Sequence, residues 1–458
     1  MPRATASTAL QERLDEALVA HGVPGASLAV LHDGVVAAAA SGVLNLDTGV
    51  EATADSLFQI GSITKVWTAT VVMGLVEEGL IDLDAPLQRY LPDFAVLDER
   101  VAGEVTIRHL LTHSSGIDGD NFADTGRGDD ALEKYVATCA ALRQLHPLGA
   151  TMSYCNTGYT LLGRVIEVTT GEVWDNAMRT RLFAPLQLTH TATLPEDVLR
   201  FRAAIGHIQP GDKPVTAPMW GLPRTAGPPG AICSTAAEVV RFAQLHLEGG
   251  TLDGAKLLEP ATVAAMQEPL VAVPSGGVGA SGSHWGLGWE LFEWDGRKVV
   301  GHDGNTIGQA AFLRVVPDAG VAIALLTNGG DVYGLFRILA GPLLREAADL
   351  DLPPDAEPPA VPLPVDPVGY VGVYEREGTS IRVEARGEGV AAVLTTTGLG
   401  AEMAPEPVEL PLHRVSADDD VFLTQHPAAP GTWLPVRFVT VGGTRVLHLA
   451  GRATPRVS

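Results

Sequence analysis

The pattern of hydrophobic and polar positions divides the first 350 residues into strand-rich ends and a helix-rich middle. An amphipathic run at residues 10–19 predicts a helix, and alternating residues 26–43, interrupted by Asp33-Gly34, predict a β-hairpin. Residues 287–328 predict further strands around the turns Asp295-Gly296 and Pro317-Asp318-Ala319-Gly320. Between them, residues 62–280 are typical of helices and long loops. We therefore expect an α/β fold whose sheet is built from both ends of this region, with a large helical insertion.

The composition changes near residue 351. Seven prolines occur between Pro353 and Pro367, and proline-rich segments form stiff linkers. After them, short alternating runs predict strands at residues 380–385, 390–395, 436–441 and 445–449. The pattern predicts two domains, at residues 1–350 and 368–458, joined by a linker at residues 351–367.

Three short motifs carry candidate chemistry: Ser62-Ile63-Thr64-Lys65, Tyr154-Cys155-Asn156 and His302-Asp303-Gly304. A serine becomes nucleophilic when a base takes its proton, and a lysine serves as that base when burial or a nearby cation lowers its pKa. Residues 66–78 fit a buried helix, which would place Lys65 one turn after Ser62 on the same face. Each motif alone also fits an ordinary helix cap, strand edge or turn. Their combination predicts a serine acyl-transfer site, assembled where the sheet meets the helices.

Longer stretches around these motifs resemble a known family. Over roughly residues 8–345 the chain is similar to the penicillin-binding-protein-like serine hydrolases, near class C β-lactamases, D-aminopeptidases, DD-peptidases and related esterases. The resemblance is carried by residues 58–65 (FQIGSITK), 79–86 (GLIDLDAP) and 106–116 (TIRHLLTHSSG). It implies a β-lactamase/transpeptidase-like fold, an antiparallel sheet with flanking helices.

The resemblance also implies roles for individual residues. Ser62 would form the acyl-enzyme, Lys65 and Tyr154 would pass protons, and Asn156 would bind a substrate amide. The backbone N–H groups of Ser62 and Asn305 would hold the oxyanion, and His302 and Gly304 would lie on a strand beside the substrate. Where β-lactamases carry Lys-Thr-Gly, this chain has His302-Asp303-Gly304, which is closer to the peptidases and esterases and weakens the case for β-lactamase activity.

Charge and cysteine content narrow the function classes. The formal net charge of −23 would repel nucleic acid and anionic membranes, so we expect neither as a partner. The chain shows no signal-peptide core and no run long enough to span a bilayer. Three cysteines without metal-like spacing suit a reducing compartment. We therefore expect a cytoplasmic enzyme without a metal or another cofactor.

Several other residues have competing interpretations. Cys155 fits a buried spacer better than a second nucleophile, and His109 and His113 have zinc-like spacing but lack the accompanying glutamate, so they fit a structural helix better. The acidic loop at residues 118–130 fits a solvated loop better than part of the cleft mouth, and a calcium site less well. Long loops are often functional, so the Pro/Gly-rich loop at residues 209–230 fits a wall of the substrate cleft as well as it fits an ordinary surface loop. Substrate contacts are predicted from this loop and from the barrel: Trp220, Arg224 and Arg445.

The second domain refines the functional expectation. Its opening, Tyr370-Val371-Gly372-Val373-Tyr374, resembles the lipocalin-like β-barrel appended to some members of the same family, a barrel that either covers the site or supports it. The combination of domains resembles stand-alone penicillin-binding-protein-type thioesterases. That resemblance implies a peptidyl thioester substrate, a carrier-protein domain of a nonribosomal peptide synthetase as partner, and release by head-to-tail macrolactamisation. The alternative is a cytoplasmic esterase or D-aminopeptidase/amidase; a binding-only relative would require a broken site.

Overall fold

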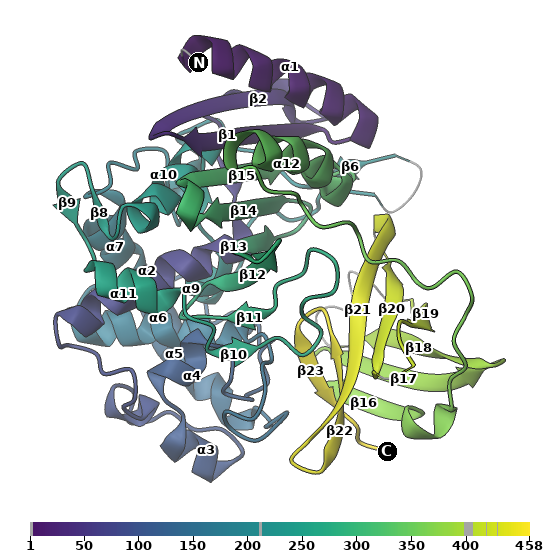
Figure 1. The fold of residues 1–458 in the computed structure, drawn as a ribbon. Coiled ribbons are helices and arrows are strands. Elements are labelled where there is room, and N and C mark those ends of the chain that lie inside the picture. Colours follow the sequence, from purple (N-terminus) through teal and green to yellow (C-terminus); the bar gives the residue numbers. More distant parts are fainter. Residues whose placement is uncertain (1–2, 210–212, 398–405, 418, 428) are drawn as a thin grey trace.

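The computed structural model describes residues 3–209, 213–397, 406–417, 419–427 and 429–458. A nine-stranded sheet forms the centre of the first domain, with strand order β10-β11-β12-β13-β14-β15-β1-β2-β3 (Figure 1). Its strands come from two parts of the chain: β1 Gly25–His32, β2 Val35–Asn45, β3 Val50–Glu51, β10 Val271–Ala272, β11 His284–Trp285, β12 Glu290–Trp294, β13 Arg297–Asn305, β14 Ala310–Val316 and β15 Val321–Thr327. All neighbouring pairs are antiparallel. The α/β fold with an antiparallel sheet is therefore confirmed.

The two faces of the sheet pack into different cores because side chains alternate along each strand. In β1, Leu28 and Val30 pack with helices α1 (Arg3–His21) and α12 (Val332–Ala348). Ala29 and Leu31 belong to the other core, which includes α2 (Thr64–Glu77) and α10 (Ala236–Leu247). The hairpin turn lies at Asp33-Gly34, where both residues have positive φ, as the sequence predicts.

The segment between β3 and β10 is mainly helical, as predicted. Besides α2 and α10, its helices are α3 Glu99–Glu104, α4 Ile107–Leu111, α5 Ala131–Thr138, α6 Asn156–Thr170, α7 Trp174–Met178, α8 Pro195–Val198, α9 Gly227–Gly230 and α11 Pro260–Met266. Short ladders join β4 Phe58–Gln59 to β7 Cys233–Ser234, β5 His207–Ile208 to β6 Val215–Thr216, and β8 Thr251–Leu252 to β9 Ala255–Lys256. None of the described helices is long and apolar enough to cross a bilayer.

Residues 351–366 contain no helix or strand and lead to an eight-stranded antiparallel sheet in sequential order. Its strands are β16 Gly372–Arg376, β17 Thr379–Arg386, β18 Gly389–Thr396, β19 Val408–Arg414, β20 Val421–His426, β21 Ala429–Val441, β22 Thr444–Leu449 and β23 Arg452–Pro455. Tyr374 bridges Arg456, and the Val457 N–H donates to the Val373 carbonyl at 2.7 Å. The first strand is thus bonded to the end of the chain, and the sheet curls into a barrel around its own apolar core.

The barrel packs directly against the first domain beside β10 and β11 (Figure 1). The Tyr154 N–H donates to the Gly451 carbonyl at 2.9 Å, and the Ala453 N–H donates to the Ser153 hydroxyl at 3.1 Å. Arg437 of β21 donates to the Pro274 carbonyl at 2.9 Å. These contacts fix the hairpin between β22 and β23 next to the second sequence motif.

Candidate active site

Ser62 lies in a tight turn between β4 and α2. Residues Gly61–Ile63 form one 3-10 turn before α2 begins at Thr64, so Ser62 stands just ahead of the helix and Lys65 lies in its first turn. Gly61 has φ +51°, and a Cβ built there would lie 2.7 Å from the Asn305 nitrogen. A Cβ on Gly304 would lie 1.9 Å from the Ile60 oxygen and 3.0 Å from the Ser62 nitrogen. The segment around Ser62 and the end of β13 can approach this closely because both contact positions are glycines. The approach places the backbone nitrogens of Ser62 and Asn305 near each other.

Lys65 occupies the first turn of α2 and is fully buried. Its Nζ donates to the Ser62 Oγ at 3.2 Å and to the Pro229 carbonyl at 2.8 Å. Burial lowers the pKa of Lys65 well below its ordinary value, and the positive charge of Arg452 lowers it further. Both effects favour the neutral amine, which can accept the proton of the Ser62 hydroxyl.

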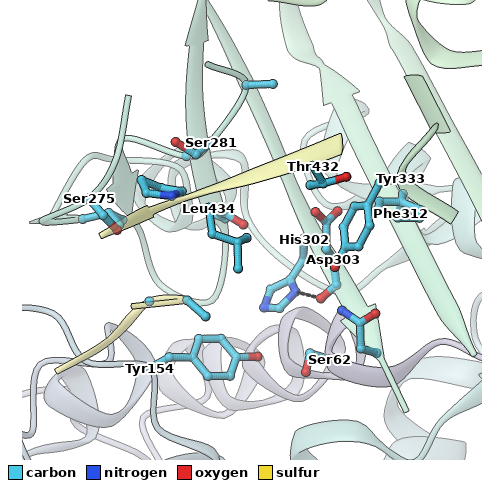
Figure 2. A pocket seen from close by; sticks show the side chains of 18 of the residues that line it. Ser62, Tyr154, Ser275, Ser281, His302, Asp303, Phe312, Tyr333, Thr432 and Leu434 are labelled. Carbon is cyan, nitrogen blue, oxygen red and sulfur yellow. Dashed lines mark hydrogen bonds between the residues drawn. The ribbon is translucent and has the colours of Figure 1, made fainter. Parts of the chain in front are cut away.

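Tyr154 points its hydroxyl toward Ser62 (Figure 2). Burial raises the pKa of Tyr154, and the Ser62 side chain acts on it in the opposite direction to a smaller extent. The Lys65 Nζ lies 4.7 Å from the centre of the Tyr154 ring, where the ring face stabilises an ammonium if the lysine becomes protonated. On this geometry Tyr154 is a neutral phenol, able to donate a proton while Lys65 accepts one.

His302 reaches the same cavity from β13 (Figure 2). Its Nδ1 lies 2.6 Å from the Asp303 carbonyl, and because a carbonyl only accepts, Nδ1 carries the proton. Burial, with a contribution from Lys65, lowers the pKa of His302 to about 3, so the ring is neutral. Its buried Nε2 has no partner among the described residues and offers an acceptor. A neutral histidine does not supply the cation that Lys-Thr-Gly supplies in β-lactamases.

Asn156 begins α6 and is tied to the barrel through Asp120. Its Nδ2 donates to the Asp120 Oδ1 at 2.9 Å. Burial alone would raise the pKa of Asp120, but Arg452 and Arg376 outweigh it and bring the value to about 2. The Asp120 carboxylate accepts from the Arg376 Nη1 at 2.6 Å and from the Arg452 Nε at 2.7 Å. A carboxylate of the first domain is thus held by two arginines of the second.

The sequence did not indicate Arg452, which the structure places at the cavity. Its guanidinium carbon lies 5.0 Å from the centre of the Tyr154 ring. The signal that could have revealed it is the Ala450-Gly451 turn, where both residues have positive φ and which aims the start of β23 at Tyr154. Arg445, the predicted contact, instead pairs with Asp420 at 2.6 Å and packs over Tyr370. It belongs to the barrel's own packing and does not line the cavity.

The cavity has a volume of about 1050 Å³. The first domain contributes Ser62, Tyr154, Asn156, Trp285 and His302, and barrel strand β21 contributes Thr432 and Leu434 from the opposite side (Figure 2). It continues past Asp303 to Phe312 and Tyr333. The barrel therefore forms a wall of the cavity that contains Ser62, which is more than a support.

Two further residues predicted to contact substrate lie elsewhere. Trp220 and Arg224 line a separate pocket of about 300 Å³. The Trp220 indole donates to the Ala204 carbonyl at 2.8 Å, and Arg224 is paired with Asp175 and Asp129. Other residues of that loop do line the main cavity: Leu222, Pro223, Ala226, Pro229 and Gly230. Residues 210–212 of the predicted loop lie outside the described residues.

The acidic loop at residues 118–130 divides into two parts. The prediction of a solvated loop is wrong for Asp118 and Asp120, because barrel groups cover both: the Glu377 N–H donates to Asp118 at 2.7 Å, and two arginines hold Asp120. It is confirmed for three exposed members, Asp124, Asp129 and Asp130. The loop therefore contributes a buried contact between the domains.

Two alternatives from the sequence are decided by burial. Cys155 is buried, its Sγ accepts from the Gly158 N–H at 3.3 Å, and burial raises the pKa of its thiol to about 12, which disfavours a thiolate. His113 lies past the end of α4 with φ +56° and does not share a helical face with His109. Its ring stacks on Tyr154 with centres 4.4 Å apart. Both residues help position Tyr154.

The fold and the arrangement of Ser62, Lys65 and Tyr154 are those of an active-site serine hydrolase. The chain belongs to the β-lactamase family, whose model matches residues 10–340. It is 50% identical over 372 residues to penicillin-binding protein 4 of Amycolatopsis lactamdurans, covering 80% of this chain and 97% of that protein.

Solved structures extend the similarity to the barrel. The crystal structure of SurE superimposes with a TM-score of 0.81 at 29% identity, over 99% of both chains, and SurE has also been solved with D-Leu. A D-amino acid amidase from Ochrobactrum anthropi, complexed with L-phenylalanine amide, gives a TM-score of 0.59 at 27% identity over 71% of this chain and 92% of that one.

Proposed function

We propose that this enzyme releases a peptidyl thioester by forming a seryl ester on Ser62 and passing the acyl group to the peptide's own amine, which gives a head-to-tail macrolactam. The observation that carries the proposal is the cavity, which is continuous from Ser62 to the barrel wall and large enough for a folded-back peptide. The similarity to SurE over both domains supports it. The D-Leu complex of SurE supports a substrate with D-residues.

In the first half-reaction, neutral Lys65 accepts the Ser62 proton as Oγ attacks the thioester carbonyl. The ammonium that forms is stabilised by the Tyr154 ring face, 4.7 Å away. The Ser62 and Asn305 N–H groups hold the oxyanion. When the C–S bond breaks, Tyr154 donates its proton to the sulfur and is reprotonated from Lys65. The products are a thiol, a seryl ester and a neutral lysine.

In the second half-reaction, the substrate amine attacks the ester carbonyl. The neutral Nε2 of His302 accepts a hydrogen bond from this amine and orients its lone pair, and Asn156 binds a neighbouring amide. Lys65 and Tyr154 carry one amine proton to the departing Ser62 Oγ. The amide bond forms as the ester bond breaks. A carrier-protein domain of a nonribosomal peptide synthetase would present the thioester.

A second candidate is hydrolysis, in which water replaces the amine. The 50% identity to a penicillin-binding protein and the likeness to a D-amino acid amidase favour acylation by small amides or β-lactams. The neutral His302 argues against strong β-lactamase activity, because the carboxylate of a β-lactam would find no cation at this position.

A pair of synthetic substrates separates the two functions. Peptidyl thioesters of about six to ten residues with a C-terminal D-residue are offered with a free or an acetylated N-terminus. Because bulk water is about 55 M, a cyclase must hold the amine at high effective concentration. The free-amine substrate should give mainly a product one water lighter than the linear acid, and the acetylated one should hydrolyse or stall. Exclusive linear acid from the whole panel, with rapid turnover of D-amino-acid amides, would establish the hydrolase.

A further inference from the structure

The catalytic cavity extends to the α12 face of the sheet, where one row of residues crosses three strands. Glu290 of β12 pairs with Gly301 of β13, and Gly301 pairs with Arg314 of β14. Directly opposed residues of antiparallel strands share a face. Gly301 contributes no side chain, and a Cβ there would lie 3.2 Å from the Arg314 Cδ. The row therefore keeps a gap between Glu290 and Arg314, on the face that carries Asp303 and opposite the one that carries His302.

Glu290 lines this cavity and forms no ion pair within the part of the chain that the structure describes. Among the other charged residues that line it, Asp303 pairs with Arg314, Asp355 with Arg337 and Arg452 with Asp120, and Asp331 is hydrogen-bonded to the His21 ring. Burial, with the nearby Asp303, raises the pKa of Glu290 to about 7, against smaller opposing effects of Arg314 and the Gly282 N–H. A cation placed beside it would restore the ionised form and form a desolvated ion pair.

The walls of this end of the cavity suit a cation. Phe292, Phe312, Tyr333 and Phe336 line it, and Figure 2 shows Phe312 and Tyr333 beside Asp303. Arg314 lies over two of the rings, 4.4 Å from the centre of Phe292 and 5.1 Å from that of Phe336, so a cation already packs on aromatic faces in this part of the protein. Because Asp303 neutralises Arg314, the trio of Glu290, Asp303 and Arg314 keeps one negative charge when Glu290 is ionised.

We propose that Glu290 is a specificity-determining residue that binds an ammonium or guanidinium group on a side chain of the acyl chain. The inference rests on the proposed acyl transfer at Ser62. The N-terminal amine of a cyclising peptide must reach the ester on the His302 face of the sheet, whereas Glu290 of β12 lies on the opposite face. The cation held there is therefore a lysine, ornithine or arginine side chain, and the substrate class is a basic peptide.

The experiment compares matched acyl chains in the full-length enzyme. Peptides carrying lysine or its neutral analogue norleucine, at each of the four positions before the thioester, are made with free and with acetylated N-termini. Each is prepared as a thioester and as a p-nitrophenyl ester, so that acylation is followed by leaving-group release whichever ester the enzyme accepts. The variant is Glu290→Gln. The control is Glu293→Gln, the same substitution at an exposed position of the same strand.

In the wild-type enzyme, kcat/KM should favour lysine over norleucine by about tenfold or more at one position of the panel, with either N-terminus. In Glu290→Gln that ratio should fall to about one, and in Glu293→Gln it should persist. A ratio of one in the wild-type enzyme overturns the proposal, as does a ratio that survives Glu290→Gln. A preference in kcat/KM for the free N-terminus that is independent of lysine and disappears in Glu290→Gln would assign Glu290 to the N-terminal amine and overturn the assignment to a side chain.

A wild-type measurement covers the case in which Glu290→Gln lowers stability. Acetylation of the lysine side chain removes its charge and keeps its stem, so lysine should exceed acetyl-lysine by a similar factor. Equal rates would overturn the proposal without any variant. The proposed function fails separately: thioesters that never acylate Ser62 would contradict it, while the lysine ratio is still read from the p-nitrophenyl esters.

Discussion

Arg452 of the barrel donates to Asp120 of the first domain at 2.7 Å, directly behind Asn156. The two residues shift the pKa of Lys65 in opposite directions. Arg452 lowers it and Asp120 raises it. The barrel is therefore electrostatically part of the catalytic site as well as one of its walls.

Ser62 is expected to carry the acyl group. Ser62→Ala should abolish acylation with little change in stability, because the substitution removes one hydroxyl from a turn held by backbone contacts. Intact mass after incubation with a fluorophosphonate or an activated peptidyl thioester measures the adduct. An adduct that persists in Ser62→Ala would transfer the role to another nucleophile.

Tyr154→Phe removes a hydroxyl at little change in volume. If the phenol donates to the leaving group, turnover should fall by about 10²-fold or more. Lys65→Ala should lose more, since both half-reactions use the amine. Steady-state rates on a thioester and on a small ester provide the measurement, and near-native rates in either variant would remove that residue from the mechanism.

Substitutions at Arg452 and at Asp120 should shift the pH dependence of acylation in opposite directions. The reactive lysine is neutral, so the rate rises with pH through the Lys65 pKa. Arg452→Met removes a cation that lowers this pKa and should move the acid limb of kcat/KM to higher pH. Asp120→Asn removes an anion that raises it and should move the limb to lower pH.

Asp124→Asn, at an exposed position of the same loop, is the matched control and should leave the limb unchanged. Shifts of both variants in the same direction would mean that the charge of this pair does not act on the catalytic base.

The barrel wall should matter more for long substrates than for short ones. Leu434 faces the cavity from β21 (Figure 2), so Leu434→Trp should reduce kcat/KM for a peptidyl thioester by about tenfold and that for a small ester much less. Thr440→Trp, at an exposed position of the same strand, is the comparison. Equal losses for long and short substrates would show that the wall does not touch the acyl chain.

Sequence patterns predicted those parts of the site that depend on local structure. The spacing of Ser62 and Lys65 follows from one helical turn, and the alternating runs predicted the main strands of the sheet and four of the eight barrel strands that the structure describes. Tyr154 and His302 could be placed at the cavity because the predicted sheet and helices meet at one seam. Cys155 could be recognised as buried from its position between two cavity residues.

The electrostatic partners could not be predicted in this way. Arg452 and Asp120 are far apart in the chain, and their pairing depends on how the barrel docks on the first domain, which no local periodicity encodes. For the same reason Arg445 and Arg452 could not be told apart, since both lie on barrel strands. Glu290 lies in a strand whose pattern is mainly apolar. That it forms no ion pair can be seen only when its neighbours on β13 and β14 are known.

The reactivity of Ser62 should report whether β13 has joined the sheet. The reason is the close contact of Gly61 with Asn305 and of Gly304 with Ile60. A refolding chain can form α2, with Ser62 and Lys65 already in place, before β13 has joined the sheet. Such a chain has Ser62 and Lys65 but lacks the Asn305 N–H, one of the two proposed oxyanion donors. Long-range strand pairings tend to form late, so the return of fluorophosphonate labelling during refolding would time the arrival of β13. Labelling of Ser62 would thus measure when the central sheet is completed during folding.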